Sequence, residues 1–67
     1  MTELANRLKV LRQERGLTQA QLAEAIGVSR KTINTIENRV FVPSALLALL
    51  IAKELGVSVH DVFELKE

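Results

Sequence analysis

The stretch from Leu17 to Asn38, LTQAQLAEAIGVSRKTINTIEN, decides the fold of this chain. It predicts two short helices joined by a tight turn at Gly27, because glycine readily adopts the left-handed conformation that ends a helix. The second helix has basic and amide side chains on one face and Ile33 and Ile36 on the other. We therefore expect its apolar face to pack on a small core and its polar face to point outward.

A common N-terminal pattern occurs three times along the chain. In each case an apolar residue is followed by Ser or Thr, three further residues and another apolar residue, at Leu17–Leu22, Val28–Ile33 and Val57–Val62. The hydroxyl can accept a free backbone N–H of the first helical turn, and the apolar pair fixes the entry angle of the chain. These patterns predict helix starts near residues 19, 30 and 59.

The remaining helices follow from apolar spacing. Leu4, Leu8 and Leu11 repeat at helical intervals, which predicts a first helix from about residue 3 to residue 14. Pro43 and Ser44 are expected to open a fourth helix that runs to residue 55, and a short fifth helix is expected at about residues 59–64. The last residues could extend into a strand. The expected fold class is all-α, a compact five-helix domain with at most a short C-terminal strand.

Length and composition restrict the function classes. The 67 residues allow one domain, 1–67, and the absence of cysteine excludes a disulfide framework or a thiolate metal site. The longest apolar run has eight residues, 45–52, whereas a bilayer-spanning helix needs about 20. No signal-peptide pattern is evident. We expect a soluble cytoplasmic protein with no membrane partner.

The charges are distributed unevenly along the chain. Residues 1–39 hold seven basic and four acidic side chains, a balance of +3, and residues 40–67 hold two basic and four acidic ones, a balance of −2. A basic front half would orient the domain toward phosphates.

The polar face of the helix near residues 30–38 has the chemistry of a base-reading surface. At 100° per residue its outward side chains fall within an arc of about 140°; they are Arg30, Lys31, Asn34, Thr35 and Asn38. Arginine and lysine can donate to guanine, and asparagine can pair with adenine as donor and acceptor. An ordinary solvated helix face would have the same periodicity.

A family resemblance favours a base-reading surface over an ordinary solvated helix face. The matching text is RLKVLRQERGLTQAQLAEAIGVSRKTINTIEN, then PS, then IAKELGVSVHDVF. On this text, residues 4–63 resemble the helix-turn-helix domain of the phage lambda-type repressor and Cro family, and especially its small stand-alone bacterial and archaeal regulators. The resemblance implies a sequence-specific transcriptional regulator, expected to be a repressor, which binds double-stranded DNA as a homodimer on a near-palindromic operator.

The resemblance also implies site residues. The base-reading positions correspond to Ser29, Arg30, Lys31 and Asn34. The phosphate-binding positions correspond to Gln19 and Asn38, and we expect Thr18 and Arg39 to assist them. Arg12 and Glu37 correspond to a structural ion pair of the family. Helical spacing supports this pair independently, since each residue lies four positions after a core residue.

The chain departs from the family after Asn38. The family usually has glycine, a basic residue and often tyrosine there, but this chain reads Arg39-Val40-Phe41-Val42. Asn38 or Arg39 must therefore adopt any left-handed conformation that ends the helix, and asparagine tolerates it better. Phosphate contacts from this loop are placed in doubt, with Arg39 as a partial substitute.

Two surfaces are candidates for the dimer interface. The fourth helix has a core stripe and a second apolar face formed by Leu46, Leu49 and Leu50, where the family usually has polar residues. The family also offers dimerisation through the C-terminal segment, here with Phe63 and Leu65. The sequence leaves this choice open.

Three other function classes compete with the regulator. An antitoxin would use the same DNA-binding helix and hold a toxin on the leucines of the fourth helix. A protein-interaction module could have the fold without DNA binding. An enzyme is disfavoured, because His60 is the single histidine and no nucleophile–base pair or carboxylate cluster is evident. We expect no cofactor, no metal and no small-molecule ligand.

Overall fold

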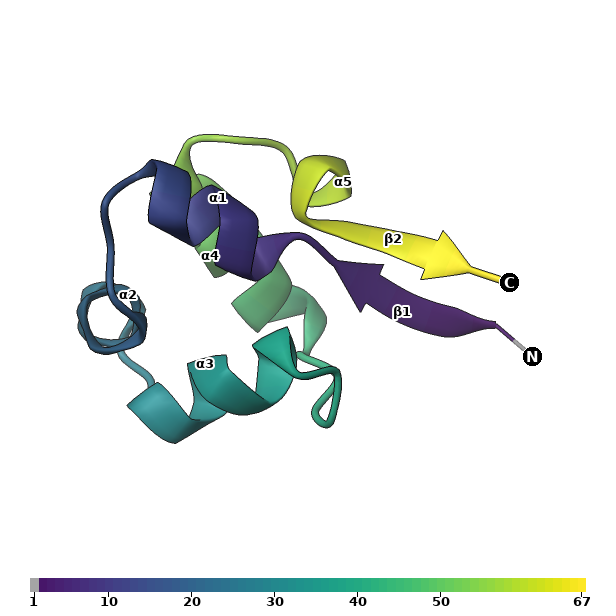
Figure 1. Cartoon of the computed structure of the whole chain (residues 1–67), viewed down its shortest axis with the longest axis horizontal. Helices are drawn as coiled ribbons and strands as arrows, with labels where there is room; N and C mark the ends of the chain where they lie inside the picture. Colours follow the sequence, from purple (N-terminus) through teal and green to yellow (C-terminus); the bar gives the residue numbers. More distant parts are fainter. Residues whose placement is uncertain (1) are drawn as a thin grey trace.

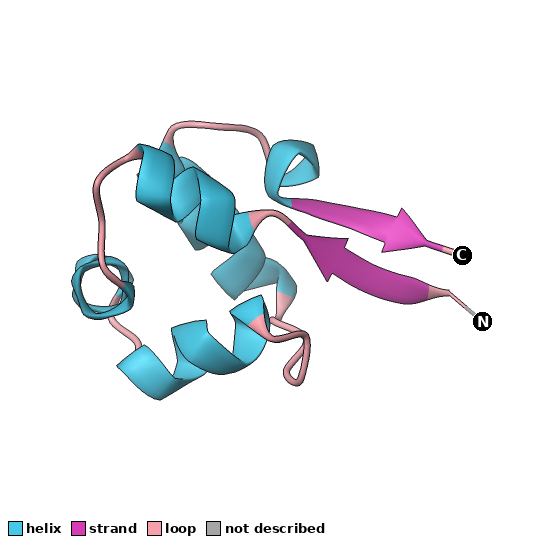
Figure 2. Cartoon of the chain, viewed as in Figure 1, coloured by secondary structure: helices cyan, strands magenta, loops and turns pink. Residues whose placement is uncertain are grey.

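The helices enclose a small apolar core, and a two-stranded sheet projects from one end of the helical body (Figure 1). The computed structural model describes residues 2–67. Its elements are β1 (Glu3–Asn6), α1 (Leu8–Glu14), α2 (Gln19–Ile26), α3 (Arg30–Glu37), α4 (Ala45–Leu55), α5 (Val59–Val62) and β2 (Phe63–Lys66). Five helices and one short C-terminal strand agree with the expected class, and the second strand is an addition (Figure 2).

The expected helix starts are confirmed, because α2, α3 and α5 begin at residues 19, 30 and 59. Thr18 Oγ1 accepts the backbone N–H of Gln21 at 3.0 Å, and the Gln21 side chain accepts that of Thr18 at 2.8 Å. The N–H of Leu47 likewise donates to Ser44 Oγ at 3.1 Å, so the fourth helix also starts where the sequence places it.

The expectation of a helix from residue 3 is wrong. Residues 3–6 form β1, and α1 begins only at Leu8. Asn6 separates the two elements, because its Oδ1 accepts the N–H of Leu8 at 3.1 Å while its Nδ2 donates to the Ile36 carbonyl at 3.0 Å. Leu4 still packs against the core, as its spacing suggested, but it does so from a strand.

The second strand explains this outcome. β2 pairs antiparallel with β1, with Leu4 opposite Leu65 and Asn6 opposite Phe63. The fifth helix therefore ends at Val62, two residues earlier than expected, because the chain becomes extended at Phe63, with φ −120° and ψ 141°. The pairing joins the two ends of the chain, and both termini lie together at the tip of the sheet (Figure 1).

Every helix contributes side chains to the core. Its buried side chains are Leu8, Leu22, Ala23, Ile33, Ile36, Ile51, Ala52, Leu55, Val62 and Phe63. The expected stripe of the fourth helix is confirmed, since Ile51 and Leu55 are buried and Leu47 and Ala48 are half-buried against them. Burial of one aliphatic side chain stabilises the folded state by about 1.5–3 kcal/mol. Ile33 and Ile36 belong to this cluster, so the core fixes α3 through its apolar face. Within residues 2–67, none of the helices has the length and apolar character needed to cross a bilayer.

Candidate nucleic-acid interface

Helix α3 presents its polar face at the surface of the domain. It packs on α2, and its apolar residues Ile33 and Ile36 are both buried in the core. The side chains expected to contact bases are all exposed; they are Ser29, Arg30, Lys31 and Asn34. The structure thus brings the expected reading residues together on one exposed helix, which lies along the edge of the helical body (Figure 1).

Arg12 and Glu37 form a buried ion pair beneath this face. Arg12 Nε donates to Glu37 Oε2 at 2.7 Å, and the two side chains are 8% and 4% exposed. A further guanidinium nitrogen, Nη1, donates to the Leu17 carbonyl at 2.7 Å. The pair therefore joins α1, the chain before α2 and the last residue of α3, which fixes the position of α3.

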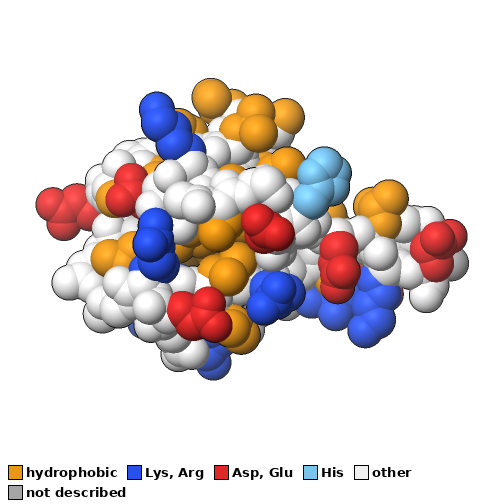
Figure 3. All heavy atoms as spheres, turned by 90° about the horizontal axis from the view of Figure 1, so that it is seen from above, with side chains coloured by type: hydrophobic (Ala, Val, Ile, Leu, Met, Phe, Trp, Pro, Cys, Tyr) orange, Lys and Arg blue, Asp and Glu red, His pale blue; other side chains and the backbone are white. Residues whose placement is uncertain are grey.

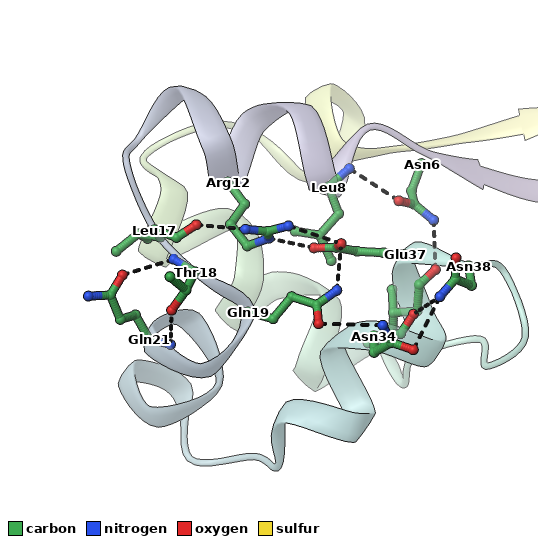
Figure 4. Close-up of polar contacts among 11 residues, drawn as sticks. Asn6, Leu8, Arg12, Leu17, Thr18, Gln19, Gln21, Asn34, Glu37 and Asn38 are labelled. Carbon is green, nitrogen blue, oxygen red and sulfur yellow. Dashed lines mark hydrogen bonds and ion pairs between the residues drawn. The ribbon is translucent and has the colours of Figure 1, made fainter.

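A series of amide side chains continues from the ion pair to the exposed face (Figure 4). Gln19 Nε2 donates to Glu37 Oε1 at 3.0 Å. Gln19 Oε1 accepts a longer contact from Asn34 Nδ2, at 3.4 Å, and Asn38 Nδ2 donates to Asn34 Oδ1 at 3.2 Å. Because the Glu37 carboxylate can only accept, it determines which end of the Gln19 amide faces Asn34.

The amide contacts leave Asn34 able to pair with a base. An asparagine amide has two N–H groups and an oxygen with two lone pairs. Gln19 takes one N–H of Asn34, and Asn38 takes one lone pair of its oxygen. One donor and one acceptor remain, which is the pair that adenine requires in the major groove.

Two of the expected contact residues also cap helices. Ser29 Oγ accepts the N–H of Thr32 at 3.2 Å, and Thr18 Oγ1 has the corresponding role for α2. Their hydroxyls therefore fix the first turns of the two helices. This aligns the free N–H groups of each N-terminus toward the outside, where an anion such as phosphate can be bound.

The loop after α3 has the left-handed residue that the sequence required. It is Arg39, with φ 61°, and Asn38 keeps a negative φ of −87°. The Arg39 guanidinium reaches Glu3 Oε1 on β1 at 3.4 Å, and both side chains are solvent-accessible. An arginine in this conformation is strained, because its Cβ crowds the following carbonyl.

We predict that Arg39→Gly stabilises the domain by about 1 kcal/mol, since relief of about 1–2 kcal/mol of backbone strain exceeds the ~0–1 kcal/mol of an exposed ion pair. Urea denaturation followed by circular dichroism measures this change. If Arg39 also contacts a phosphate, the same variant binds DNA more weakly and with a smaller salt dependence. Glu3→Gln removes the ion pair without changing the backbone and serves as the control. Lower stability of Arg39→Gly would contradict the strain argument.

Sequence reasoning missed two features of the site. The first is Asn6, which ties β1 to the Ile36 carbonyl at the end of α3. The second is the contact of Gln19 with Glu37 and Asn34, which places Gln19 between the ion pair and the exposed polar face of α3. Both link residues from separate elements, and no local pattern signals them.

The candidate interface residues have different environments. Leu46 and Leu49 are 69% and 58% exposed, and Leu50 is half-buried beside Ile26 and Lys53. Phe63 belongs to the core, so of the C-terminal pair only Leu65, 75% exposed, projects freely. Figure 3 shows one cluster of hydrophobic side chains at the edge of a face that otherwise mixes hydrophobic and charged groups.

The family follows from a sequence match. A helix-turn-helix family model, HTH_3, matches residues 8–62, which include every helix and the polar face of α3. The chain belongs to the helix-turn-helix family. Relatives of this chain are named as HTH-type transcriptional regulators. The two helices that the sequence predicted for the motif are α2 and α3.

Three known proteins illustrate the relationship. The HTH-type transcriptional regulator YgzD of Bacillus subtilis is 44% identical over 64 residues, which is 96% of this chain and 97% of YgzD. The antitoxin HipB of Escherichia coli K12 is 49% identical over 37 residues, 55% of this chain and 42% of HipB. The structure of the biofilm regulator SinR in complex with DNA has a TM-score of 0.75 and 34% identity, covering 81% of this chain and 87% of SinR.

Proposed function

We propose that this helix-turn-helix protein is a repressor that binds a near-palindromic operator as a homodimer through α3. The observation that supports this most strongly is the exposed face with Arg30, Lys31 and Asn34, held rigidly from below by the buried Arg12–Glu37 pair. Base reading needs side chains in fixed positions, and the amide contacts of Gln19 supply that order.

In the proposed complex, some residues of the site contact bases and others contact phosphates. Arg30 and Lys31 donate to guanine edges, Asn34 pairs with adenine, and Ser29 lines the groove. Gln19 and the N-terminus of α2 bind phosphate, together with Thr18, Asn38 and Arg39. Two copies would place their α3 helices in successive major grooves, roughly 34 Å apart. The relatives YgzD of Bacillus subtilis and MJ0272 of Methanocaldococcus jannaschii come from prokaryotes, which supports the cytoplasm as the proposed place of action.

Selection of bound duplexes from a random library tests this function. The expected result is a consensus with two inverted half-sites, together with an affinity that falls steeply as salt increases because phosphate contacts release counterions. The control is a protein in which Arg30, Lys31 and Asn34 are all replaced by alanine. A wild-type selection that yields no consensus would overturn sequence-specific reading.

The antitoxin function is a second candidate, supported by the similarity to HipB and by the exposed leucines of α4. It predicts a stable complex with a toxin encoded beside this chain, and that complex should dissociate when Leu46 and Leu49 become lysine. Coexpression with the neighbouring open reading frame measures this. A protein-interaction module without DNA binding would instead fail to retain any duplex even at low salt.

A further inference from the structure

Three side-chain amides of the interface all donate in the same direction, toward the buried ion pair (Figure 4). Asn38 Nδ2 donates to Asn34 Oδ1 at 3.2 Å, and Asn34 Nδ2 donates to Gln19 Oε1 at 3.4 Å. Gln19 Nε2 then donates to Glu37 Oε1 at 3.0 Å. An amide that is turned over keeps nearly the same shape but exchanges its donor and its acceptor. The common direction of these three amides therefore needs a chemical cause.

Groups that can only accept hydrogen bonds fix this direction at both ends of the series. At one end is the Glu37 carboxylate, whose other oxygen accepts from Arg12 Nε at 2.7 Å. At the other end is the backbone carbonyl of Asn34, which accepts from Asn38 Nδ2 at 2.9 Å. Reversal of the series would place an amide oxygen against each of these acceptors and leave both contacts unmade. The amide of Asn34 is thus held in one orientation from two sides.

The orientation of the Asn34 amide decides which base it can contact. Its side chain is exposed on α3, and the contacts to Gln19 and Asn38 leave one N–H and one oxygen lone pair free. Adenine offers a matching acceptor and donor in the major groove, whereas guanine offers two acceptors and thymine one. An amide that turns freely could direct its N–H groups to guanine or thymine. The fixed amide instead sets its oxygen against the O6 atom of guanine, which is repulsive.

We propose that Glu37 and Asn38 are positioning residues that hold the Asn34 amide in one orientation and so restrict its base partner to adenine. Asn38 acts directly, and Glu37 acts through Gln19, which keeps a second N–H for phosphate. Neither positioning residue has to touch a base. This role rests on the proposed function, in which α3 reads bases, and it specifies how one position of the operator is discriminated. The Arg12–Glu37 pair therefore serves base specificity as well as the position of α3.

Asn38→Asp tests this role through the base preference at one position. The aspartate has nearly the same shape but only accepts hydrogen bonds, so it repels both oxygens of Asn34 and favours a turned amide. The measurement is the ratio of the affinities for the selected operator and for a duplex with guanine in place of the adenine that Asn34 contacts. Asn34→Ala identifies that base pair, because it removes the contact. We expect Asn38→Asp to lower the ratio about fivefold or more, the lower end of the discrimination that a well-formed pair of base contacts gives.

Two comparisons separate this effect from a general change in charge. The new negative charge weakens binding to every duplex, so it cancels in the ratio. Val40→Asp adds the same charge two residues further along, at a side chain that is 77% exposed, and should lower both affinities without changing the ratio. Asn34→Ala/Asn38→Asp should have the same ratio as Asn34→Ala, because no amide is left to orient. A further fall of the ratio in that double variant would overturn the proposal, since Asn38 would then act on the base by another route.

The order of the Asn34 amide can also be measured without DNA, by nuclear magnetic relaxation of the side-chain nitrogens. In the wild type this amide should be about as ordered as the backbone of α3, and the exposed Gln13 on α1 provides a mobile reference. Gln19→Ala/Asn38→Ala removes both contacts and should give Asn34 the mobility of Gln13. Circular dichroism confirms that each variant is folded. If Asn34 and Gln13 are equally mobile in the wild type, the amide is not held and the proposal is wrong.

The outcomes separate this role from the proposed function. A wild-type chain that selects no consensus would overturn base reading and the restriction to adenine together. A clear inverted repeat for which Asn38→Asp leaves the ratio unchanged would contradict the positioning role alone. An Asn34→Ala variant that changes the preference at no base pair would also overturn that role, since Asn34 would then contact no base.

Discussion

Glu37→Ala is expected to lower the free energy of unfolding by about 3 kcal/mol or more, because it leaves the Arg12 guanidinium buried without its charged partner. Arg12 keeps only the bond to the Leu17 carbonyl, and Gln19 loses its acceptor on Glu37. In a domain of this size the loss corresponds to a fall of roughly 15 °C in Tm. Thermal unfolding followed by circular dichroism measures it.

Two further variants make this prediction decisive. Glu24→Ala removes an exposed carboxylate on the neighbouring helix and should change stability by less than about 0.5 kcal/mol. Arg12→Met/Glu37→Met removes both charges, and it should be more stable than the sum of the single changes implies, because neither charge is left alone in the core. If Glu37→Ala is no more damaging than Glu24→Ala, the buried pair does not hold α3 in place.

Arg30→Ala is expected to reduce discrimination between the selected operator and a scrambled duplex, because it removes donors to a base edge. A well-formed contact of this kind contributes about 1–3 kcal/mol, or roughly 5- to 150-fold in the affinity ratio. Asn34→Ala should have the same effect at a different base pair, namely an adenine position. Mobility shifts with the two duplexes at one salt concentration measure the ratio.

Gln19→Ala should act differently from either reading variant. Its expected effect is weaker binding to both duplexes, because Gln19 lies at the N-terminus of α2 and binds phosphate in the proposed complex. Lys53→Ala, on α4, is the control for a general loss of positive charge. Equal losses on both duplexes for Arg30→Ala would exclude a base-reading role for that residue.

Most of the helical framework could be predicted from the sequence. The starts of α2 and α3 depend on a hydroxyl that accepts a backbone N–H three residues along the chain, and the end of α2 depends on a glycine with φ 78°. The start of α5 depends on the Asp61 carboxylate, which accepts the backbone N–H of Ser58 at 3.0 Å. These interactions are local, so a short stretch of sequence contains all of their participants. The same reasoning identified the polar face of α3 and the apolar stripe of α4.

The candidate site was only partly predictable. Arg12 and Glu37 were paired from helical spacing and family resemblance, and the structure brings them to 2.7 Å. The position of Gln19 between Glu37 and Asn34 had no sequence signal, because it depends on the angle at which α2 crosses α3. The sequence predicted that either Asn38 or Arg39 adopts the left-handed conformation. In the structure Arg39 adopts it, although asparagine tolerates this conformation better than arginine does.

The sequence by itself determined where α2 and α4 begin and end, where α3 and α5 begin and which helix faces are apolar, because caps, glycine turns and helical periodicity act within a few residues. Only the tertiary structure decided that residues 3–6 form a strand instead of the first helical turn. The strand forms because Glu3 lies opposite Lys66 and Leu4 opposite Leu65. A pairing of this kind depends on side chains from the other end of the chain, and strand preference is set by such neighbours more than by the strand itself.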